Sequence, residues 1–314
     1  MNKLIGIVAL LFSTTAWAAP SICVNSKSIW SGELCTIRPS QTDPMIQDGS
    51  ESNRGFGDHV IGFPVNSNNK LWVHFGGSGA KPYLPNPNRY LNESWLSEIM
   101  GQGYTVIDLA YDNEVSITES CQGQQLNNCA GAARREVLSG VDTSPLRNVN
   151  TQNSIIYRLR VLIDYLTENN VPLPIPSFEG WNNLSVSGHS QGAGVSYFIA
   201  KFNGVVFACY LGGPYDVPDP IPNQRPPAQY IADWYLDTSA NNTPVNNMGA
   251  FLTVQDENYK QFTFAYDLIG LKKEKHWFEA DKRRYVNEIG NPVDGHAAAV
   301  QDPSLAELRA RACF

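Results

Sequence analysis

The stretch N-L-S-V-S-G-H-S-Q-G-A-G-V-S-Y-F-I-A, residues 183–200, places Ser190 two residues from a glycine on either side. The residues before Ser190 favour a β-strand and those after it favour a helix, so residues 188–192 would form the turn between them. A turn this sharp strains the backbone of its central residue and leaves no room for side chains two positions away, which explains the glycines. The stretch predicts that the serine hydroxyl stands exposed above a sheet.

This turn makes Ser190 a candidate nucleophile. A serine hydroxyl becomes reactive when a base removes its proton and preset donors stabilise the negative charge that then develops. The amide of Gln191 would lie at a helix N-terminus, where backbone N–H groups and the helix dipole favour such charge. The alternative is that Ser190 only caps the helix.

Strand and helix patterns alternate along the chain. Short apolar runs predict strands, and apolar positions at helical spacing predict helices, with Asn153 or Ser154 as the cap of one of them. The expected strands are 71–75, 105–110, 184–187, 205–211 and 251–254, and the expected helices are 95–100, 153–168 and 191–202. Because this alternation is typical of βαβ units, we expect an α/β fold in a single domain, residues 19–314, with a mostly parallel central sheet and helices on both faces.

Two segments interrupt this alternation. Residues 112–150 are polar and have no clear periodicity, and residues 214–249 are rich in proline before they reach Trp234 and Tyr235. Each is either a solvated surface excursion or an insertion that shapes a substrate site. We expect the first insertion to contain a disulfide and the second to be cap-like.

The N-terminal residues predict export. Residues 1–18 combine Lys3, an apolar run and small residues at positions 16 and 18, which is the layout of a signal peptide cleaved after Ala18. The apolar run is shorter than the roughly 20 residues of a membrane-spanning helix, and no later stretch is a candidate. We therefore expect a secreted or periplasmic protein without an integral membrane segment.

An exported chain would carry its six cysteines into an oxidising compartment, where disulfides are their expected use. Two pairs are close in sequence and the third is what remains: Cys23 with Cys35, Cys121 with Cys129, and Cys209 with Cys313. Cys209 lies in an apolar run, so a buried free thiol is the alternative there. No C-x-x-C or Cys/His cluster indicates a zinc site, and we expect no metal and no cofactor.

The formal charge of −7 at pH 7, without any basic run, excludes one class of partner. Proteins that bind nucleic acids present clustered lysine and arginine to the phosphates. We therefore expect no nucleic-acid partner.

A second motif, H-F-G-G-S-G at 74–79, ends the expected strand 71–75. Acyl transfer passes through an oxyanion that needs two or more preset donors, each worth about 3 kcal/mol in the transition state. A glycine-rich turn lets backbone amides point into such a site, so Gly77 or Ser78 would act with Gln191. A phosphate-binding loop is the rival interpretation, but the spacings of its two common motifs are absent.

Histidine is the usual base for a serine near neutral pH, and the chain has five. His74 and His189 belong to the two motifs, and His59 precedes both in an expected N-terminal strand. His276 lies in the charged run K-K-E-K-H-W-F-E, which is typical of a solvated face, whereas His296 follows a loop and precedes a helical run. The sequence favours His296 over His276 as the base.

A carboxylate must orient that histidine. Asp256 follows the expected strand 251–254, which makes it the favoured acid in the chain order Ser190, Asp256, His296. The competing carboxylates are Glu257, Asp216 and Asp294.

Together these residues resemble the α/β-hydrolase superfamily, from about residue 68 to the end of the chain. The resemblance lies in H-F-G-G-S-G after a strand, G-H-S-Q-G-A-G at 188–194 and D-G-H at 294–296. The chain is further similar to a subgroup of secreted bacterial serine hydrolases in its two-cysteine insertion and in A-Y-D-N-E (110–114), N-S-I-I-Y-R-L-R-V-L-I-D-Y-L (153–166) and L-G-G-P-Y-D (211–216). The resemblance implies an α/β-hydrolase fold with an eight-stranded sheet and a nucleophilic serine. The glycine loop reads H-F-G-G instead of H-G-G-G, which leaves open which amide is the second oxyanion donor.

The sequence therefore predicts an exported serine hydrolase that cleaves small-molecule or polymeric carboxylic esters through a Ser-His-Asp triad. The same triad cleaves amides, so a serine peptidase or amidase is the nearest alternative. A binding protein that keeps the hydrolase scaffold without turnover is the alternative from another class.

Overall fold

The computed structural model describes residues 20–48, 57–85, 89–121, 124, 126, 128–214, 216, 232–238, 241–281, 284–286 and 292–314. The expected signal peptide, residues 1–18, lies outside the described residues, as do 215, 217–231 and 239–240 of the expected second insertion. In the described part of the chain, no helix has both the length and the apolar character needed to cross a membrane.

A central sheet organises the chain. Its strands are β1 (Ser26–Ile29), β2 (Gly32–Ile37), β3 (His59–Pro64), β4 (Leu71–Phe75), β7 (Thr105–Leu109), β8 (Leu184–His189), β9 (Phe207–Leu211), β10 (Met248–Thr253) and β11 (Trp277–Ala280). Their order in space is β1-β2-β3-β7-β4-β8-β9-β10-β11, which is a nine-stranded sheet and not the eight-stranded one that the resemblance implies. The strands from β7 to β11 pair in parallel, and the N-terminal β1, β2 and β3 extend the sheet in antiparallel pairing.

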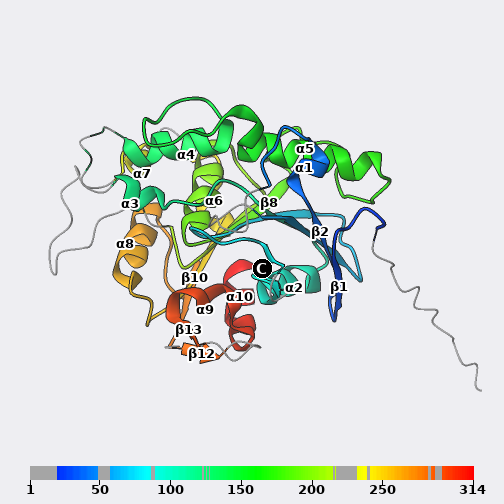
Figure 1. Cartoon of the computed structure of the whole chain (residues 1–314). Coiled ribbons are helices and arrows are strands. Elements are labelled where there is room, and N and C mark those ends of the chain that lie inside the picture. Colours follow the sequence, from blue (N-terminus) through cyan, green and yellow to red (C-terminus); the bar gives the residue numbers. More distant parts are fainter. Residues whose placement is uncertain are drawn as a thin grey trace, which may run out of the picture.

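Helices cover both faces of this sheet (Figure 1). On β4, Leu71, Val73 and Phe75 belong to one apolar core and Trp72 belongs to the other, because successive side chains of a strand point to opposite faces. The first core contains residues of α4 (Cys129–Ser139), α5 (Ile155–Glu168) and α6 (Gln191–Phe202), and the second contains residues of α2 (Glu93–Gly101), α9 (Gly295–Gln301) and α10 (Ala306–Cys313). The expected α/β fold, with a mostly parallel sheet and helices on both faces, is confirmed.

The remaining elements are short or lie at the ends of the main strands. They are α1 (Pro39–Thr42), α3 (Ile117–Cys121), α7 (Asp233–Leu236), α8 (Tyr259–Ile269), β5 (Tyr83–Leu84), β6 (Arg89–Tyr90), β12 (Arg284–Val286) and β13 (Pro292–Asp294), with single 3-10 turns at Thr151–Asn153, Val245–Asn247 and Pro303–Leu305.

The local patterns predict most boundaries within two or three residues. The helix expected over 191–202 is α6, and the helix expected over 153–168 begins at Ile155 because the Ser154 hydroxyl accepts a hydrogen bond from the Tyr157 amide. The strand expected from Val205 starts two residues later, after Gly204 has turned the chain with a φ of 77°.

The insertion at 112–150 is more ordered than its sequence indicates. It forms α3 and α4, and α4 buries Ala133, Val137 and Leu138 in the same core as α5 and α6. Alternating small, charged and apolar residues hide the helical spacing in this segment. The packing of α4 excludes a fully solvated excursion.

The structure pairs the six cysteines as Cys23–Cys35, Cys121–Cys129 and Cys209–Cys313. The first pair joins the segment before β1 to β2, the second joins α3 to α4, and the third joins β9 to α10. The pairing is the one that we expect from the sequence.

Replacing Cys209 and Cys313 together by alanine should destabilise the fold more than replacing Cys121 and Cys129. The Cys209–Cys313 bridge spans 104 residues and the Cys121–Cys129 bridge spans 8. In the chain-entropy view, loops of these lengths correspond to about 4.7 and about 2.5 kcal/mol of stabilisation. Urea unfolding of the oxidised proteins measures both losses, and a larger loss for the short loop would contradict this ranking.

Candidate active site

Ser190 occupies a strained turn between β8 and α6. Its φ is 55° and its ψ is −118°, a conformation that residues other than glycine rarely adopt. A Cβ atom built on Gly188 would lie 2.0 Å from the Gly192 carbonyl oxygen, and one built on Gly192 would lie 2.0 Å from the Phe75 carbonyl oxygen. Both glycines are therefore required for the close approach of α6 to β8 and β4.

The glycine-rich turn after β4 packs directly against this serine. A Cβ atom on Gly77 would lie 3.1 Å from the Ser190 Cβ. The turn is fixed by Asn113, whose Nδ2 donates to the carbonyl oxygens of Gly77 (2.6 Å) and Ala80 (2.8 Å). Tyr111 adds a hydrogen bond from its hydroxyl to the Gly76 carbonyl oxygen at 2.7 Å.

Three amide groups around Ser190 are free to donate. Among the described residues, the backbone N–H groups of Gly77, Ser78 and Gln191 make no hydrogen bond. The amide of Gln191 is at the first residue of α6, where the helix dipole adds positive potential. These are the amides that the sequence predicts as oxyanion donors.

His296 and Asp256 lie in contact although 40 residues separate them. His296 is the second residue of α9 and Asp256 follows β10, and the His296 Nδ1 donates to the Asp256 Oδ2 at 2.6 Å. Thr253 holds the two segments together because its hydroxyl donates to the Gly295 carbonyl oxygen at 2.7 Å. With Nδ1 bound to the carboxylate, the lone pair of Nε2 is left to accept a proton.

The end of β9 brings His296 next to the serine turn. The Ser190 amide donates to the Leu211 carbonyl oxygen at 3.0 Å. A Cβ atom on the following residue, Gly212, would lie 3.3 Å from the His296 Nδ1. The structure thus brings Ser190, His296 and Asp256 to the carboxyl ends of β8, β9 and β10, where open α/β sheets bind their ligands.

Asp216, the main competing carboxylate, has other partners. It receives two hydrogen bonds from the buried Arg134 guanidinium, at 2.6 and 2.8 Å, and one each from Trp234 Nε1 and the Thr118 hydroxyl. This cluster joins the two insertions, since Arg134 and Thr118 come from 112–150 and Asp216 and Trp234 from 214–249. Of the remaining carboxylates, Glu257 is exposed and Asp294 caps α9 by accepting from the Ala297 amide.

His276 is not on a solvated face, contrary to the sequence interpretation. It is 7% exposed. Its Nδ1 accepts from the Lys272 amide at 3.0 Å, and its Nε2 therefore donates to the Asn246 Oδ1.

The sequence alone indicated no role for Arg134, Tyr111 or Asn113, although the motif A-Y-D-N-E contains the last two. Within the described ranges, no group of three or more His, Cys, Asp or Glu residues is arranged to hold a metal ion.

His74 and His59 are also core residues. The Ser187 hydroxyl accepts from Trp72 Nε1 at 2.7 Å and Trp95 Nε1 at 3.1 Å, so its own proton is donated to the His74 Nδ1. His59 accepts from the Ala110 amide through its Nδ1. The His74 imidazole therefore links β4 to β8, and the His59 imidazole links β3 to the end of β7.

The surroundings of the histidines raise the pKa of His296 and lower the pKa values of His74 and His189. Burial lowers the pKa of His296, but the hydrogen bond and charge of Asp256, helped by Asp294 and Glu257, outweigh it and raise that pKa above 6.5. Burial, with the neighbouring His296, lowers the pKa of His189 to about 3. Burial likewise lowers the pKa of His74 to about 3, so these two histidines are neutral at physiological pH.

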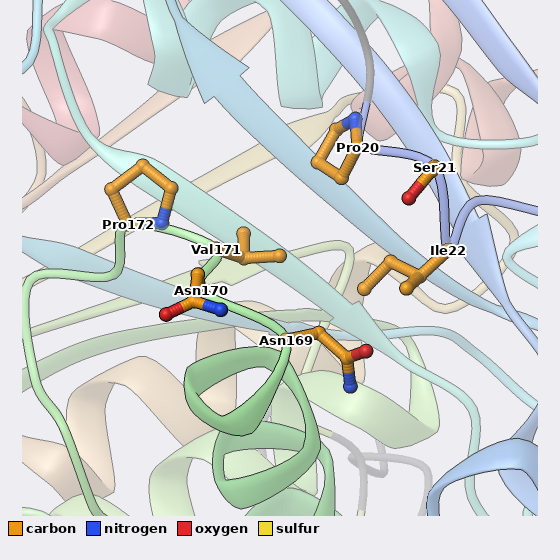
Figure 2. Close-up of a pocket in the computed structure, with 7 residues that line it drawn as sticks. All are labelled: Pro20, Ser21, Ile22, Asn169, Asn170, Val171 and Pro172. Atoms are coloured by element: carbon orange, nitrogen blue, oxygen red, sulfur yellow. The ribbon is translucent and has the colours of Figure 1, made fainter.

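A separate pocket lies at the first described residues (Figure 2). Its lining comes from Pro20, Ser21 and Ile22 and from the segment 169–172 after α5. None of its lining side chains is titratable or nucleophilic at neutral pH, and none belongs to the site around Ser190.

Histidine titration by NMR tests this geometry without any substrate. The ring signals of His296 should titrate with a midpoint above pH 6.5, because the Asp256 carboxylate stabilises the charged ring. In Asp256→Asn the main partner of the charged ring is lost, so burial should outweigh the remaining charges of Asp294 and Glu257 and the midpoint should fall below 6.5. Asp267→Asn, the same change at an exposed position of α8, should leave the midpoint unchanged. An unchanged midpoint in Asp256→Asn would exclude the contact.

Comparison of the sequence with protein-family models and with curated proteins gives no match. Among solved structures, the chain is similar to esterase B from Lactobacillus rhamnosis inhibited by a tributyrin phosphonate, with 12% identity, 82% of this chain and 77% of that chain covered, and a TM-score of 0.39. A truncated carbohydrate esterase from gut microbiota matches with 11% identity, 94% and 98% coverage and a TM-score of 0.40. Dienelactone hydrolase from Anabaena variabilis ATCC 29413 matches with 15% identity, 92% and 97% coverage and a TM-score of 0.37. At these identities the likeness concerns the fold alone.

Proposed function

We propose that the chain is an exported serine hydrolase of the α/β-hydrolase superfamily that cleaves carboxylic esters. The observation that carries this proposal is the 2.6 Å contact between His296 Nδ1 and Asp256 Oδ2 beside a serine held at a φ of 55°. Residues 19–314 would form its single domain after loss of the signal peptide. The three disulfides support an extracellular or periplasmic location.

The proposed reaction uses these groups in two steps. The Ser190 Oγ attacks the ester carbonyl carbon while its proton passes to the His296 Nε2, and the charged ring is stabilised by Asp256. The amide of Gln191, with that of Gly77 or Ser78, binds the oxyanion. His296 then gives the proton to the departing alcohol. In the second step His296 removes a proton from a water molecule whose oxygen attacks the acyl carbon, and it returns that proton to the Ser190 Oγ as the acid leaves.

The second insertion favours small or soluble esters over long acyl chains. In the described part of this insertion, the large aromatic side chains of Trp234 and Tyr235 are 3% and 5% exposed. They pack against Tyr197 and Phe198 of α6 and do not form an exposed apolar lid. Cleavage of amides by the same groups is the second candidate activity, because the triad geometry serves both bonds.

Ser190→Ala should abolish covalent labelling by a fluorescent organophosphonate with a fluoride leaving group. In the wild type, the Oγ–phosphorus bond forms as fluoride leaves, and intact mass reports one adduct. Ser196→Ala, a buried serine of α6 that the mechanism does not use, should label like the wild type. Labelling that persists in Ser190→Ala would remove Ser190 from the mechanism, and a folded wild type that does not label would favour the binding-protein alternative.

Short p-nitrophenyl esters should be cleaved at least about tenfold faster, in kcat/KM, than a palmitoyl ester, because the aromatic side chains described in the second insertion are buried and offer no exposed surface to a long chain. The matching p-nitroanilide should be slower than the acetate ester. Initial rates at equal substrate concentration measure all three. A preference for the long chain, or for the anilide, would contradict the proposed substrate class.

A further inference from the structure

The two residues that flank Ser190 have buried polar side chains. His189 is 9% exposed and Gln191 is 5% exposed. The turn itself requires only the glycines at 188 and 192 for steric reasons, so the size of these two side chains is not dictated by the backbone. Each of them instead bonds to a different segment of the site.

His189 is bonded to the segment that carries the candidate base. Its Nε2 donates to the His296 carbonyl oxygen at 3.0 Å, because a carbonyl can only accept. The two rings are 4.7 Å apart between centroids. The same imidazole also lies against the glycine turn, since a Cβ atom on Gly77 would be 3.2 Å from the His189 Nδ1. A neutral His189 can fill this position without repelling a charged His296.

Gln191 is bonded to the opposite side of the site. Its Oε1 accepts from the Ser78 hydroxyl at 3.0 Å and from the Ile117 amide at 2.9 Å. One carboxamide oxygen therefore joins three segments: the start of α6, the glycine turn and the start of α3. The backbone amides of Ser78 and Gln191, two of the candidate oxyanion donors, are held in register by this bridge.

We propose that His189 and Gln191 are positioning residues, the first for the general base and the second for the oxyanion donors, in the ester hydrolysis proposed above. Neither side chain touches the reacting atoms. His189 fixes the segment of the candidate base His296 to the turn around Ser190, and Gln191 fixes the glycine turn with its oxyanion donors to the same turn. The residues on either side of Ser190 thus align the base and the oxyanion donors with the serine. The inference rests on the proposed function, and the experiment below separates the two.

The variants His189→Phe and Gln191→Met keep a planar ring and an unbranched chain of similar length, respectively, and remove the hydrogen bonds. Displacement of a catalytic group by about 1 Å costs up to about a hundredfold in rate. We expect kcat for a short p-nitrophenyl ester to fall about tenfold to a hundredfold in each variant, with KM within about twofold. His189→Gln, which retains an N–H donor, should recover part of the loss.

Two controls separate positioning from a general loss of packing. His276→Phe removes a buried imidazole with two hydrogen bonds outside the site, and Ser97→Ala removes one hydroxyl of the buried Ser31–Ser97 pair. Both should keep the wild-type kcat even if their melting temperatures fall. Ser78→Ala should slow the reaction as Gln191→Met does, and the double variant should be no slower than the slower single one, because the two changes break one shared bond.

The outcomes are distinguishable. If the folded wild type neither labels with the organophosphonate nor cleaves esters, the proposed function fails. If the wild type is active and the folded variants retain its kcat, the positioning roles are wrong and the proposed function stands. If Ser78→Ala and Gln191→Met act additively, the role of Gln191 is wrong and the proposed function again stands. If Gln191→Met does not fold, Ser78→Ala alone tests that bridge. If His189→Phe does not fold, His189→Met compared with His189→Gln tests the bond to His296.

Discussion

The close approach of α6 to the ends of β4 and β8 is the constraint on which the rest of the site depends. Gly192 lies so near the Phe75 carbonyl oxygen that no side chain fits, and Ser190 absorbs the reversal of direction at a φ of 55°. A conformation of this kind costs about 1–3 kcal/mol and persists only where the surrounding packing maintains it. Here α6 supplies that packing, because every residue from Gln191 to Lys201 is buried.

Hydrogen bonds from polar side chains connect the loops above the sheet. Asn113 and Tyr111 hold the glycine turn, and Thr253 holds the start of α9. Arg134 bonds both to Asp216 and to the Gln191 carbonyl oxygen, so it joins the described parts of the insertions to the serine turn. Removing one partner from a buried pair of this kind costs about 3–5 kcal/mol. The described parts of both insertions are thus anchored to one another by Arg134 and Asp216.

A hydrogen-bonded carboxylate distinguishes His296 from the other buried histidines that the structure describes. The hydrogen bonds of His59, His74 and His189 in the described part of the chain go to groups other than carboxylates, so desolvation lowers their pKa values and they act as neutral hydrogen-bonding groups. His296 is also buried, but the Asp256 carboxylate reverses the sign of the shift. A basic imidazole near a serine therefore exists at one of these positions because one carboxylate is within reach.

The sequence by itself determined the features that depend on neighbours along the chain. The serine turn, most strands and the bounds of α6 follow from hydrophobic period and from the steric need for glycine, and both act over a few residues. Local sequence failed for α4, whose helical spacing is masked by charged and small residues, and for His276, whose burial comes from a turn packed on β10. Only the tertiary structure decided that His296 contacts Asp256 while Asp216 binds Arg134, since these partners are 40 and 82 residues apart. The physical reason is that a carboxylate binds whichever donor the sheet order brings to it, and strand order is set by packing across the whole chain.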